Sequence, residues 1–505
     1  MRARVAFLLA TCVLDPHRLA GQEASPYVPL AHWAMPYVEQ LISAGVLEDP
    51  TPLTRPLRQA DLVRALEAVD TSNLGEATTA TIRRLHAEFK PDIHGPRYRV
   101  DLNGGLAAAT YTVRDPLELG RGTPPRQSGN HVFANAGGQL LFAFGPFVGV
   151  SHPTVDTRLE LDPDWFGTSD NATRFAEGYV SGQWRFGELF FGILDRNWGP
   201  SGIQGVLLSD NPYSLDHLAL TVGMPRIKLQ VYVSQLDTRT DSTGAPVNRY
   251  MIQHRLWIRP EGRWTLALWQ GSVLSGVGRQ LEPWYLNAAT LGVLRAGSAG
   301  ANANFFVGGE FERRGNVSVF GQFMLDDIQI SRKTAADLKP TSYAFTAGVK
   351  GRLAETATLT AFYTQVANLT YRNEDNLQVP LLHLLGTGRN FDDYDQATAR
   401  LTLLTQSGLL LQPEATVLRQ GQGDPRLPHP LVPDYPTTAT IFQGVVERTL
   451  RLALGANWQH PSWGLVANGG VHLIHNAAHV TGASDTRWVG SLGFDFRLHG
   501  EGSLP

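Results

Sequence analysis

The sequence has little cysteine, no surplus of basic charge and no long apolar run, and each shortage excludes a class of protein. Cys12 is the only cysteine among 505 residues, so a framework of disulfide bonds is not expected. The net charge of −3 leaves no basic surplus to neutralise the phosphates of a nucleic acid, which is therefore not expected as a partner. No run beyond the N-terminus approaches the roughly 18 apolar residues of a membrane helix. Such a chain crosses a membrane only as a closed β-barrel.

Charged residues are scarce as well, and glycine is abundant. Charged side chains make up 18% of the chain, below the roughly 25% of ordinary soluble domains. The 51 glycines exceed the usual share of about 7%. A glycine-rich and charge-poor chain with many aromatic residues is typical of a large β structure.

The first residues have the pattern of a secretory signal peptide. Arg2 and Arg4 precede an apolar run at 5–14, and small residues follow at Ala20 and Ala24. We expect residues 1–24 to export the chain and to be removed, together with Cys12. A buried first helix is the alternative interpretation of the same residues.

Residues 26–90 have the spacing of helices. Apolar positions recur at helical intervals through 31–46, through the segment that follows Pro56, and through 78–89. Proline suits the first turn of a helix, and Lys90-Pro91 ends the third one. A small helical bundle is expected here.

From Tyr98 onward the apolar period changes from helical to two, which indicates β-strands. Within 227–236 the residues Ile227, Leu229 and Val231 alternate with polar neighbours, and within 343–353 aromatic and aliphatic residues alternate with Thr346 and Lys350. A soluble β-sandwich also alternates in this way, and it remains an alternative interpretation.

The connections between these strands alternate between short and long. Turns such as 145–146, 259–263 and 459–463 are tight, whereas connections such as 197–212 and 369–395 are long and polar. Outer-membrane barrels have this pattern, with short periplasmic turns and long outer loops around an even number of strands. We therefore predict an all-β fold, an antiparallel barrel of about 18 strands at 97–498, with a tail at 499–505.

Tryptophans near the predicted strand ends suit the interfacial girdles of a membrane barrel. They are Trp257, Trp264, Trp458 and Trp463.

No enzyme motif of established specificity is present, so no catalysis and no cofactor are expected. His472, His475 and His479 have a spacing that binds metal on a helix, but a strand running into a loop does not bring them together, so no metal is expected either. Asp326 and Asp327 end a strand. Paired carboxylates can perform acid–base chemistry, although beside a wide lumen they more often bind water, hydroxyls or an arginine.

The stretch from Asn197 to Pro212 is the most distinctive connection. Its turn residues surround a short apolar run, Val206 to Leu208, which is unfavourable in a free outer loop. Counting turns places this connection between the fifth and sixth strands. We expect it to fold back against the barrel wall or into the lumen, braced by Trp198 and Asn211.

This stretch also resembles a known family. Asn197-Trp198-Gly199-Pro200 followed by Leu207-Leu208-Ser209-Asp210-Asn211-Pro212 resembles a "WGP … LS-N-N … P" motif of the Wzi-type capsule assembly proteins. Gln322-Phe323-Met324-Leu325-Asp326-Asp327 resembles a second stretch of that family. The resemblance covers about 97–498. Asp210 departs from it, since the family more often has Asn there.

The resemblance implies a non-enzymatic barrel of the bacterial outer membrane that binds surface or capsular polysaccharide and assists its assembly or attachment. It also implies a helical bundle at the periplasmic end. Residues His32-Trp33-Ala34, Ala44-Gly45-Val46 and Pro56-Leu57-Arg58 further resemble an S-layer-homology-like repeat, which implies a possible cell-wall polymer as a partner. A plain structural bundle is the alternative.

Outer-membrane lipid and a surface polysaccharide are thus the expected partners, and a passive porin is the main alternative function. An outer-membrane enzyme acting on lipid or glycan is a further one. The candidate residues for contacting a saccharide or bracing the loop are Asn197, Trp198, Ser209, Asp210, Asn211, Asp326 and Asp327.

Overall fold

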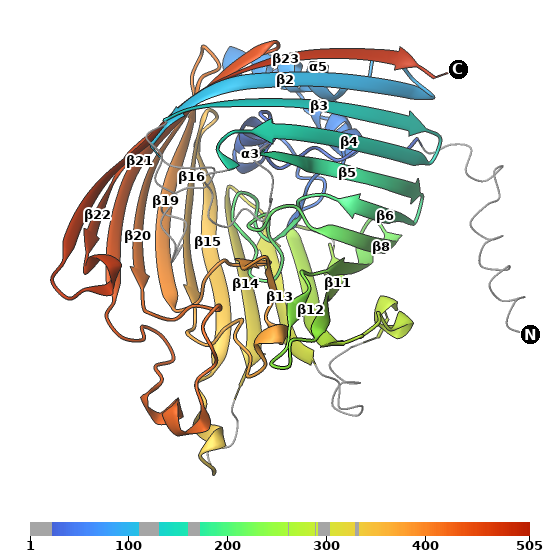
Figure 1. Ribbon diagram of the computed structural model, residues 1–505. Helices are drawn as coiled ribbons and strands as arrows, with labels where there is room; N and C mark the ends of the chain where they lie inside the picture. Colours follow the sequence, from blue (N-terminus) through green and yellow to red (C-terminus); the bar gives the residue numbers. More distant parts are fainter. Residues whose placement is uncertain are drawn as a thin grey trace, which may run out of the picture.

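The computed structural model describes residues 23–110, 131–159, 172–260, 262–287, 289–290, 303–328 and 333–504. Within these residues, eighteen strands form an antiparallel sheet that closes on itself, because the first strand, β2, pairs with both β3 and the last strand, β23. One further strand of the sheet, the two-residue β10, pairs with β11 and is not part of the closed ring. The predicted barrel of about 18 strands is confirmed (Figure 1).

The strands of the barrel follow one another in chain order around the ring. Their bounds are β2 (Arg97–Ala109), β3 (Val132–Phe144), β4 (Phe147–Asp156), β5 (Thr173–Trp184), β6 (Gly187–Ile193), β8 (Asp216–Met224), β9 (Ile227–Gln235), β11 (Pro246–Ile258), β12 (Trp264–Val277), β13 (Ala303–Arg313), β14 (Val317–Asp327), β15 (Ser342–Ala354), β16 (Ala357–Val366), β19 (Tyr394–Leu404), β20 (Leu410–Gln420), β21 (Glu447–His460), β22 (Trp463–His475) and β23 (Ser484–Ser503). The two-residue strands are β1 (Thr54–Arg55), β7 (Asn197–Trp198), β10 (Arg239–Thr240), β17 (Leu381–Leu382) and β18 (Leu385–Gly386).

Short and long connections alternate around the barrel, as the sequence indicates. One end carries turns such as 145–146 between β3 and β4, where Gly145 has a φ of +52° that favours glycine. The other end carries the long connections, including 194–215 between β6 and β8 and 367–393 between β16 and β19. We call these the short-turn end and the long-loop end; the connection between β20 and β21, in orange, projects at the bottom of Figure 1.

The last strand is longer than predicted. Residues 499–503 are not a tail but continue β23, which ends at Ser503. They pair with the start of β2, from Arg97 opposite Ser503 to Asp101 opposite His499. The closing seam of a barrel satisfies the backbone groups of both edge strands, so these residues gain hydrogen bonds that a free tail lacks.

The outward face of the barrel is apolar. Leu102, Leu268 and Leu452 are about half exposed or more, and each alternates with inward-facing neighbours along its strand. Polar side chains such as Lys350 take the inward positions, as the alternation predicts. An exposed apolar surface around a closed barrel is the surface that lipid covers.

One of the four tryptophans predicted at the membrane interface faces the lumen instead of the lipid. Trp264 and Trp458 are 43% and 44% exposed, which suits an outer girdle. Trp257 is only 2% exposed, and its Nε1–H donates to the carbonyl of Pro52 inside the barrel at 3.0 Å. Its assignment to the girdle is therefore wrong, because its position in β11 has inward parity.

A small bundle of helices closes the short-turn end, and α3 is visible inside the ring of strands in Figure 1. It contains α3 (Met35–Ser43), α4 (Gln59–Glu67) and α5 (Glu76–Phe89). Its apolar core extends to Leu404 and Leu410, which flank the turn between β19 and β20. The Tyr37 hydroxyl donates to the carbonyl of Asn457 at 2.8 Å. None of the described helices has the length and apolar character needed to cross a membrane.

The predicted leader includes two residues that belong to the fold. Ala24 is 1% exposed, and its backbone N–H donates to the carbonyl of Gly145 at 2.7 Å. Glu23 forms an ion pair with Arg97 at 2.8 Å. The boundary after residue 24 is therefore too late for these contacts, and the rest of the predicted leader lies outside the described residues.

We predict that Leu452→Arg destabilises the barrel in lipid by about 2–4 kcal/mol, because it places a charge in the middle of the lipid-facing surface of β21. Denaturant titration of protein folded into lipid vesicles measures this change. The control is Asn468→Arg on β22, whose exposed side chain faces the lumen, and it should change stability by less than about 1 kcal/mol. Equal effects of the two variants would contradict the assigned faces.

Candidate functional site

Three segments fold into the lumen and fill its middle, and we call them together the central plug: residues 49–58, 194–215 and 367–393. The apolar run Val206 to Leu208 lies within the plug and is at most 3% exposed. It belongs to the main core cluster of the barrel, with Trp198 and Tyr371. The prediction that this outer connection folds back into the lumen is confirmed, and it does connect the fifth and sixth barrel strands.

The N-terminal part of the plug is joined to the 194–215 loop by a short β-ladder. Thr54 pairs with Trp198 and Arg55 pairs with Asn197. The N–H of Gly199 donates to the carbonyl of Leu53 at 3.0 Å. Backbone pairing of this kind gives residues buried in the lumen the hydrogen bonds that water cannot supply.

Arg255 on β11 fixes this ladder to the barrel wall. Its side chain is fully buried; Nη2 donates to the carbonyl of Leu53 at 2.7 Å and Nη1 to Oγ1 of Thr54 at 2.7 Å. The same guanidinium forms an ion pair with Glu310, which is equally buried. It also lies 5.0 Å from the centroid of the Trp198 ring, a cation–π contact.

The second loop of the plug interlocks with the first. Ser209 donates from its backbone N–H to the carbonyl of Thr387 at 2.8 Å and from its hydroxyl to the carbonyl of Gly388 at 2.6 Å. The Asn211 amide donates to the carbonyl of Gly386 at 2.9 Å. A Cβ on Gly388 would lie 2.4 Å from the carbonyl oxygen of Val206, so this close approach requires glycine.

Tyr371 links the two motifs that are far apart in the sequence. Its backbone N–H donates to Oδ2 of Asp326 at 2.9 Å, and its hydroxyl donates to the carbonyl of Val206. Burial raises the pKa of the Tyr371 hydroxyl well above its ordinary value, so it stays a donor. Asp327 instead pairs with Lys339 at 2.9 Å, in the long connection to β15.

The candidate residues of the distinctive stretch are occupied by bracing contacts. The Asn197 side chain donates to the carbonyl of Ile203 at 2.9 Å and accepts from the N–H of Gly205 at 2.7 Å, which closes its own loop. Trp198 is 1% exposed. Asp210 differs from the others, because its side chain is exposed and lines a cavity.

That cavity lies beneath the 194–215 loop and beside α3, and we call it the α3 cavity. It has a volume of about 350 Å³, within the range of small-molecule sites. Its roof is formed by 201–204 with Asn197 and Asp210, its floor by α3, and its wall by strands β15 to β20. The wall carries the hydroxyls and amides of Thr358, Thr360, Thr402 and Gln412.

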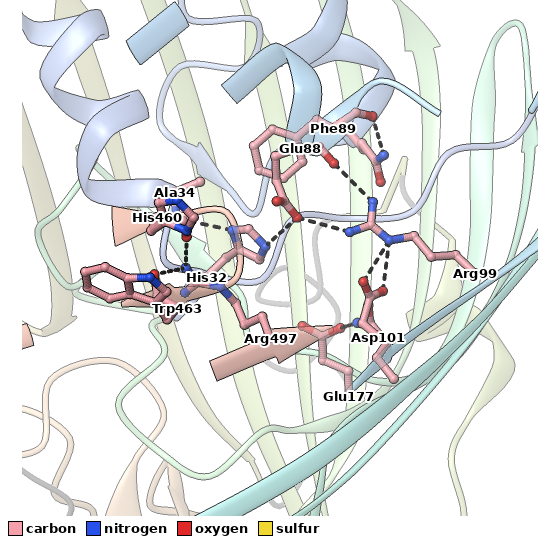
Figure 2. Close-up of polar contacts among 12 residues, drawn as sticks. His32, Ala34, Glu88, Phe89, Arg99, Asp101, Glu177, His460, Trp463 and Arg497 are labelled. Atoms are coloured by element: carbon pink, nitrogen blue, oxygen red, sulfur yellow. Dashed lines mark hydrogen bonds and ion pairs between the residues drawn. The ribbon is translucent and has the colours of Figure 1, made fainter. Parts of the chain in front are cut away.

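A second cavity of about 350 Å³ lies between the helices and the inner faces of β2 to β5 and β23, and we call it the wall cavity. Figure 2 shows the chain of charges along it. Arg99 donates to both oxygens of Asp101 at 2.8 and 3.0 Å and to Glu88 at 3.0 Å. Arg497 donates to the carbonyl of His460 at 2.7 Å.

His32 lies at the edge of the wall cavity as a neutral imidazole. Its Nδ1 accepts from the backbone N–H of Ala34 at 3.2 Å, so the proton belongs on Nε2, which points toward Glu88 at 3.8 Å (Figure 2). Burial and the nearby Arg99 and Arg497 lower the pKa of His32 to about 3. The imidazole therefore remains uncharged at neutral pH.

The three histidines with metal-like spacing do not converge. His472 is buried, whereas His475, three residues further along β22, is exposed on the opposite face. Nδ1 of His479 lies 2.8 Å from the carbonyl oxygen of Val445, in the loop that precedes β21. No group of three or more metal-binding side chains is placed to hold an ion within the described part of the chain.

Sequence reasoning missed the residues that hold the plug together. Arg255 occupies an inward position of β11. The alternation of inward and outward residues along this strand is the sequence feature that indicates its burial. Tyr371 and the 367–393 loop gave no periodic pattern, so their contacts with the 194–215 loop depend on the tertiary fold. Glu310, the charge partner of Arg255, likewise occupies an inward position on β13.

The fold is similar to that of Wzi, an outer-membrane protein involved in group 1 capsule assembly in Escherichia coli and described as a carbohydrate-binding β-barrel. The two chains share 14% identity with a TM-score of 0.62, and the match covers 95% of this chain and 100% of that chain. At this identity the likeness shows a common fold, which confirms the resemblance at the level of architecture.

More distant barrels also match. OprD of Pseudomonas aeruginosa shares 11% identity with a TM-score of 0.43 over 81% of this chain and 96% of that chain. The outer membrane channel DcaP of Acinetobacter baumannii shares 10% with a TM-score of 0.40 over 81% and 99%. No family model matches the sequence, and no curated protein matches it.

We predict that Arg255→Met loosens the plug, because it leaves the buried carboxylate of Glu310 without its charge partner. Removing one member of a buried pair costs about 3–5 kcal/mol. Denaturant unfolding and the rate of proteolysis within 44–60 measure the effect. The double variant Arg255→Met/Glu310→Gln should recover part of the loss, and Arg185→Met at an exposed turn should change nothing. A loss that the double variant does not reduce would contradict the pairing.

We also predict that acid loosens the docking of residues 26–36. The pKa of His32 is about 3 in the folded chain and about 6.5 when unfolded, so its contribution is fully present above pH 6.5 and is lost as the pH falls toward 3. Hydrogen exchange of this segment at pH 7 and pH 4.5 should show an open population that rises roughly tenfold or more.

His32→Gln should flatten that response, which separates the imidazole from Glu88, whose pKa is raised by burial. His86→Gln, at a partly exposed position of α5, should keep it. An unchanged response in His32→Gln would assign the acid sensitivity to another group.

Proposed function

We propose that this protein is a non-enzymatic barrel of the bacterial outer membrane that binds surface polysaccharide and assists the assembly or attachment of a capsule. The observation that carries the proposal is the central plug. Two long loops are buried in the lumen and bonded to each other through Ser209, Asn211 and Gly388, and a cavity lined by hydroxyl and amide groups lies beside them. The barrel interior is thereby built as a binding surface.

The polar lining of the lumen suits a carbohydrate. The hydroxyls of Thr360 and Thr402 and the amide of Gln412 line the α3 cavity, where a ligand can reach them. Surfaces of hydroxyls, amides and fixed guanidinium groups exchange hydrogen bonds with sugar hydroxyls at little cost in reorganisation. The shared fold with a carbohydrate-binding barrel supports the same reading.

The orientation in the membrane follows from the two kinds of connection. In outer-membrane barrels the short turns face the periplasm and the long loops face outward. The helical bundle packs on the short-turn end, through Leu404 and Leu410, and would therefore lie in the periplasm. There it could contact a cell-wall polymer, as its S-layer-homology-like residues imply.

Deletion of the gene tests the proposal directly. We expect cells without the protein to shed more surface polysaccharide into the medium and to retain a thinner layer, measured by uronic acid or total sugar assay of cell and medium fractions. Complementation with Gly388→Ala should restore less retention than the wild type, because the added Cβ lies 2.4 Å from a backbone oxygen of the facing loop. Gly469→Ala, which meets nothing within 4 Å, is the matched control.

Retention that is unchanged in the deletion strain would count against the capsule function. A conductance measurement in planar bilayers tests the porin alternative: large and steady pores from the wild-type protein would favour a channel. A Gly388→Ala variant that conducts more than the wild type would instead agree with a lumen closed by interlocked loops.

A further inference from the structure

The α3 cavity contains a buried cation with an unusual environment. Lys350 on β15 lines this cavity, faces inward and is 6% exposed. Its Nζ lies 5.4 Å from the centroid of the Phe320 ring. Among the described residues, no carboxylate lies within 4.0 Å of it and no acceptor is within hydrogen-bond distance. An ammonium group that is largely removed from water and has no carboxylate partner makes this lining a favourable position for an anionic group of a ligand.

The other cations of the cavity are already neutralised. Arg55 forms ion pairs with Glu39 at 2.8 Å and with Asp49 at 2.9 Å. Arg400 forms a pair with Glu414, at 2.6 Å. Lys350 is thus the cationic group of this lining that the described side chains leave available to a ligand.

Two further donors of the same lining also lack an acceptor in the described structure. Nε2 of Gln40, on α3, and Oγ of Ser201, in the roof, are buried and form no hydrogen bond. Buried donors without partners mark a place where an acceptor-rich group is missing. The hydroxyls of Thr360 and Thr402 lie along the wall of the same cavity and can hold the rest of a sugar ring, whereas the Thr358 hydroxyl donates to Oε1 of Gln40 at 2.6 Å and orients its amide.

Glu312 on β13 does not complete the site. Its side chain also points inward and the residue is 6% exposed, yet no ion pair within 4.0 Å joins it to Lys350 among the described residues. It offsets part of the positive charge at long range but leaves the three N–H bonds of the ammonium unused.

We infer that the α3 cavity binds the carboxylate of an acidic sugar residue, with Lys350 as its counter-ion and Gln40 and Ser201 as additional donors. The inference rests on the proposed function, because it names the chemical class of saccharide that the barrel takes. A carboxylate is the acceptor that an ammonium and neutral N–H and O–H donors satisfy together. A ring carrying it would lie between the threonine wall and the floor formed by α3.

The wall cavity gives a contrast within the same lumen. Five carboxylates and three guanidinium groups line it, so an acidic saccharide is disfavoured there. The lining residues are Glu88, Arg99, Asp101, Arg174, Glu177, Asp195, Asp495 and Arg497. The lining of the α3 cavity has two carboxylates, Glu39 and Asp210, against three cations, Arg55, Lys350 and Arg400, so its charge balance favours an anionic ligand more than that of the wall cavity.

The test measures binding of two matched probes to the full-length protein in detergent: oligoglucuronate and its carboxyl-reduced form, which is an uncharged oligoglucose. Isothermal titration calorimetry should show at least tenfold tighter binding of the charged probe. That difference should shrink as ionic strength rises. The surface polysaccharide isolated from the producing cells, before and after carboxyl reduction, serves as a second pair.

Lys350→Gln should remove most of the preference for the charged probe and leave binding of the neutral probe unchanged. Lys350→Arg keeps the charge and should retain at least part of the preference. The matched control is Lys228→Gln, because Lys228 on β9 also faces an aromatic ring, that of Trp257 at 5.2 Å, outside the α3 cavity. Heat-modified mobility of each variant confirms that the barrel is folded.

Equal binding of charged and reduced probes by the wild type, or an unchanged preference in Lys350→Gln, would overturn the inference and leave the proposed function standing. Tighter binding of glucose 6-phosphate than of glucuronate would also overturn it, by assigning the cavity to phosphate. Failure of the wild type to bind any saccharide, the isolated polysaccharide included, would count against the proposed function itself.

Discussion

The buried guanidinium of Arg255 is the contact on which the interior depends. It joins the barrel wall, through Glu310, to the N-terminal segment, through Leu53 and Thr54, and to the inward loop, through the Trp198 ring. A buried guanidinium costs free energy unless its charge partner and its hydrogen-bond acceptors are all present. It therefore favours the arrangement of the plug that supplies them. The ladder between β1 and β7 and the interlock with 367–393 follow from that arrangement.

The barrel could be predicted from the sequence because its determinants are local. Alternation along each strand sets which face is apolar, and the alternation of short and long connections sets the topology, so 18 strands and the inward Lys350 followed. The predicted end of the last strand was wrong because residues 499–503 owe their strand conformation to pairing with β2, some 400 positions earlier. The prediction for Trp257 was wrong because a tryptophan near a strand end does not by itself show which face of the strand it lies on.

The contents of the lumen were only partly predictable. An apolar run in an outer loop indicates that the loop is covered, and Val206 to Leu208 is covered. The sequence does not indicate what covers it, because the partner loop, with Tyr371 and Gly388, is chosen by three-dimensional proximity. The hydrogen bonds that hold this packing come from the side chains of Asn197, Ser209 and Asn211. Motif residues of this kind shape a site without having to touch its ligand.

The central plug and the α3 cavity therefore have different roles in the lumen. The central plug is held by a buried ion pair and by hydrogen bonds between its loops, so a saccharide that displaced it would have to replace those contacts and is expected to bind beside it. Of the two cavities, the α3 cavity is the one whose lining holds an ammonium group without a carboxylate partner among the described residues, with two neutral donors beside it. Unsatisfied donors carry a cost in the empty protein that a ligand acceptor removes. In the α3 cavity the unpaired donors lie in the lining of a cavity that a ligand can enter, so a bound acceptor removes this cost and gains binding free energy.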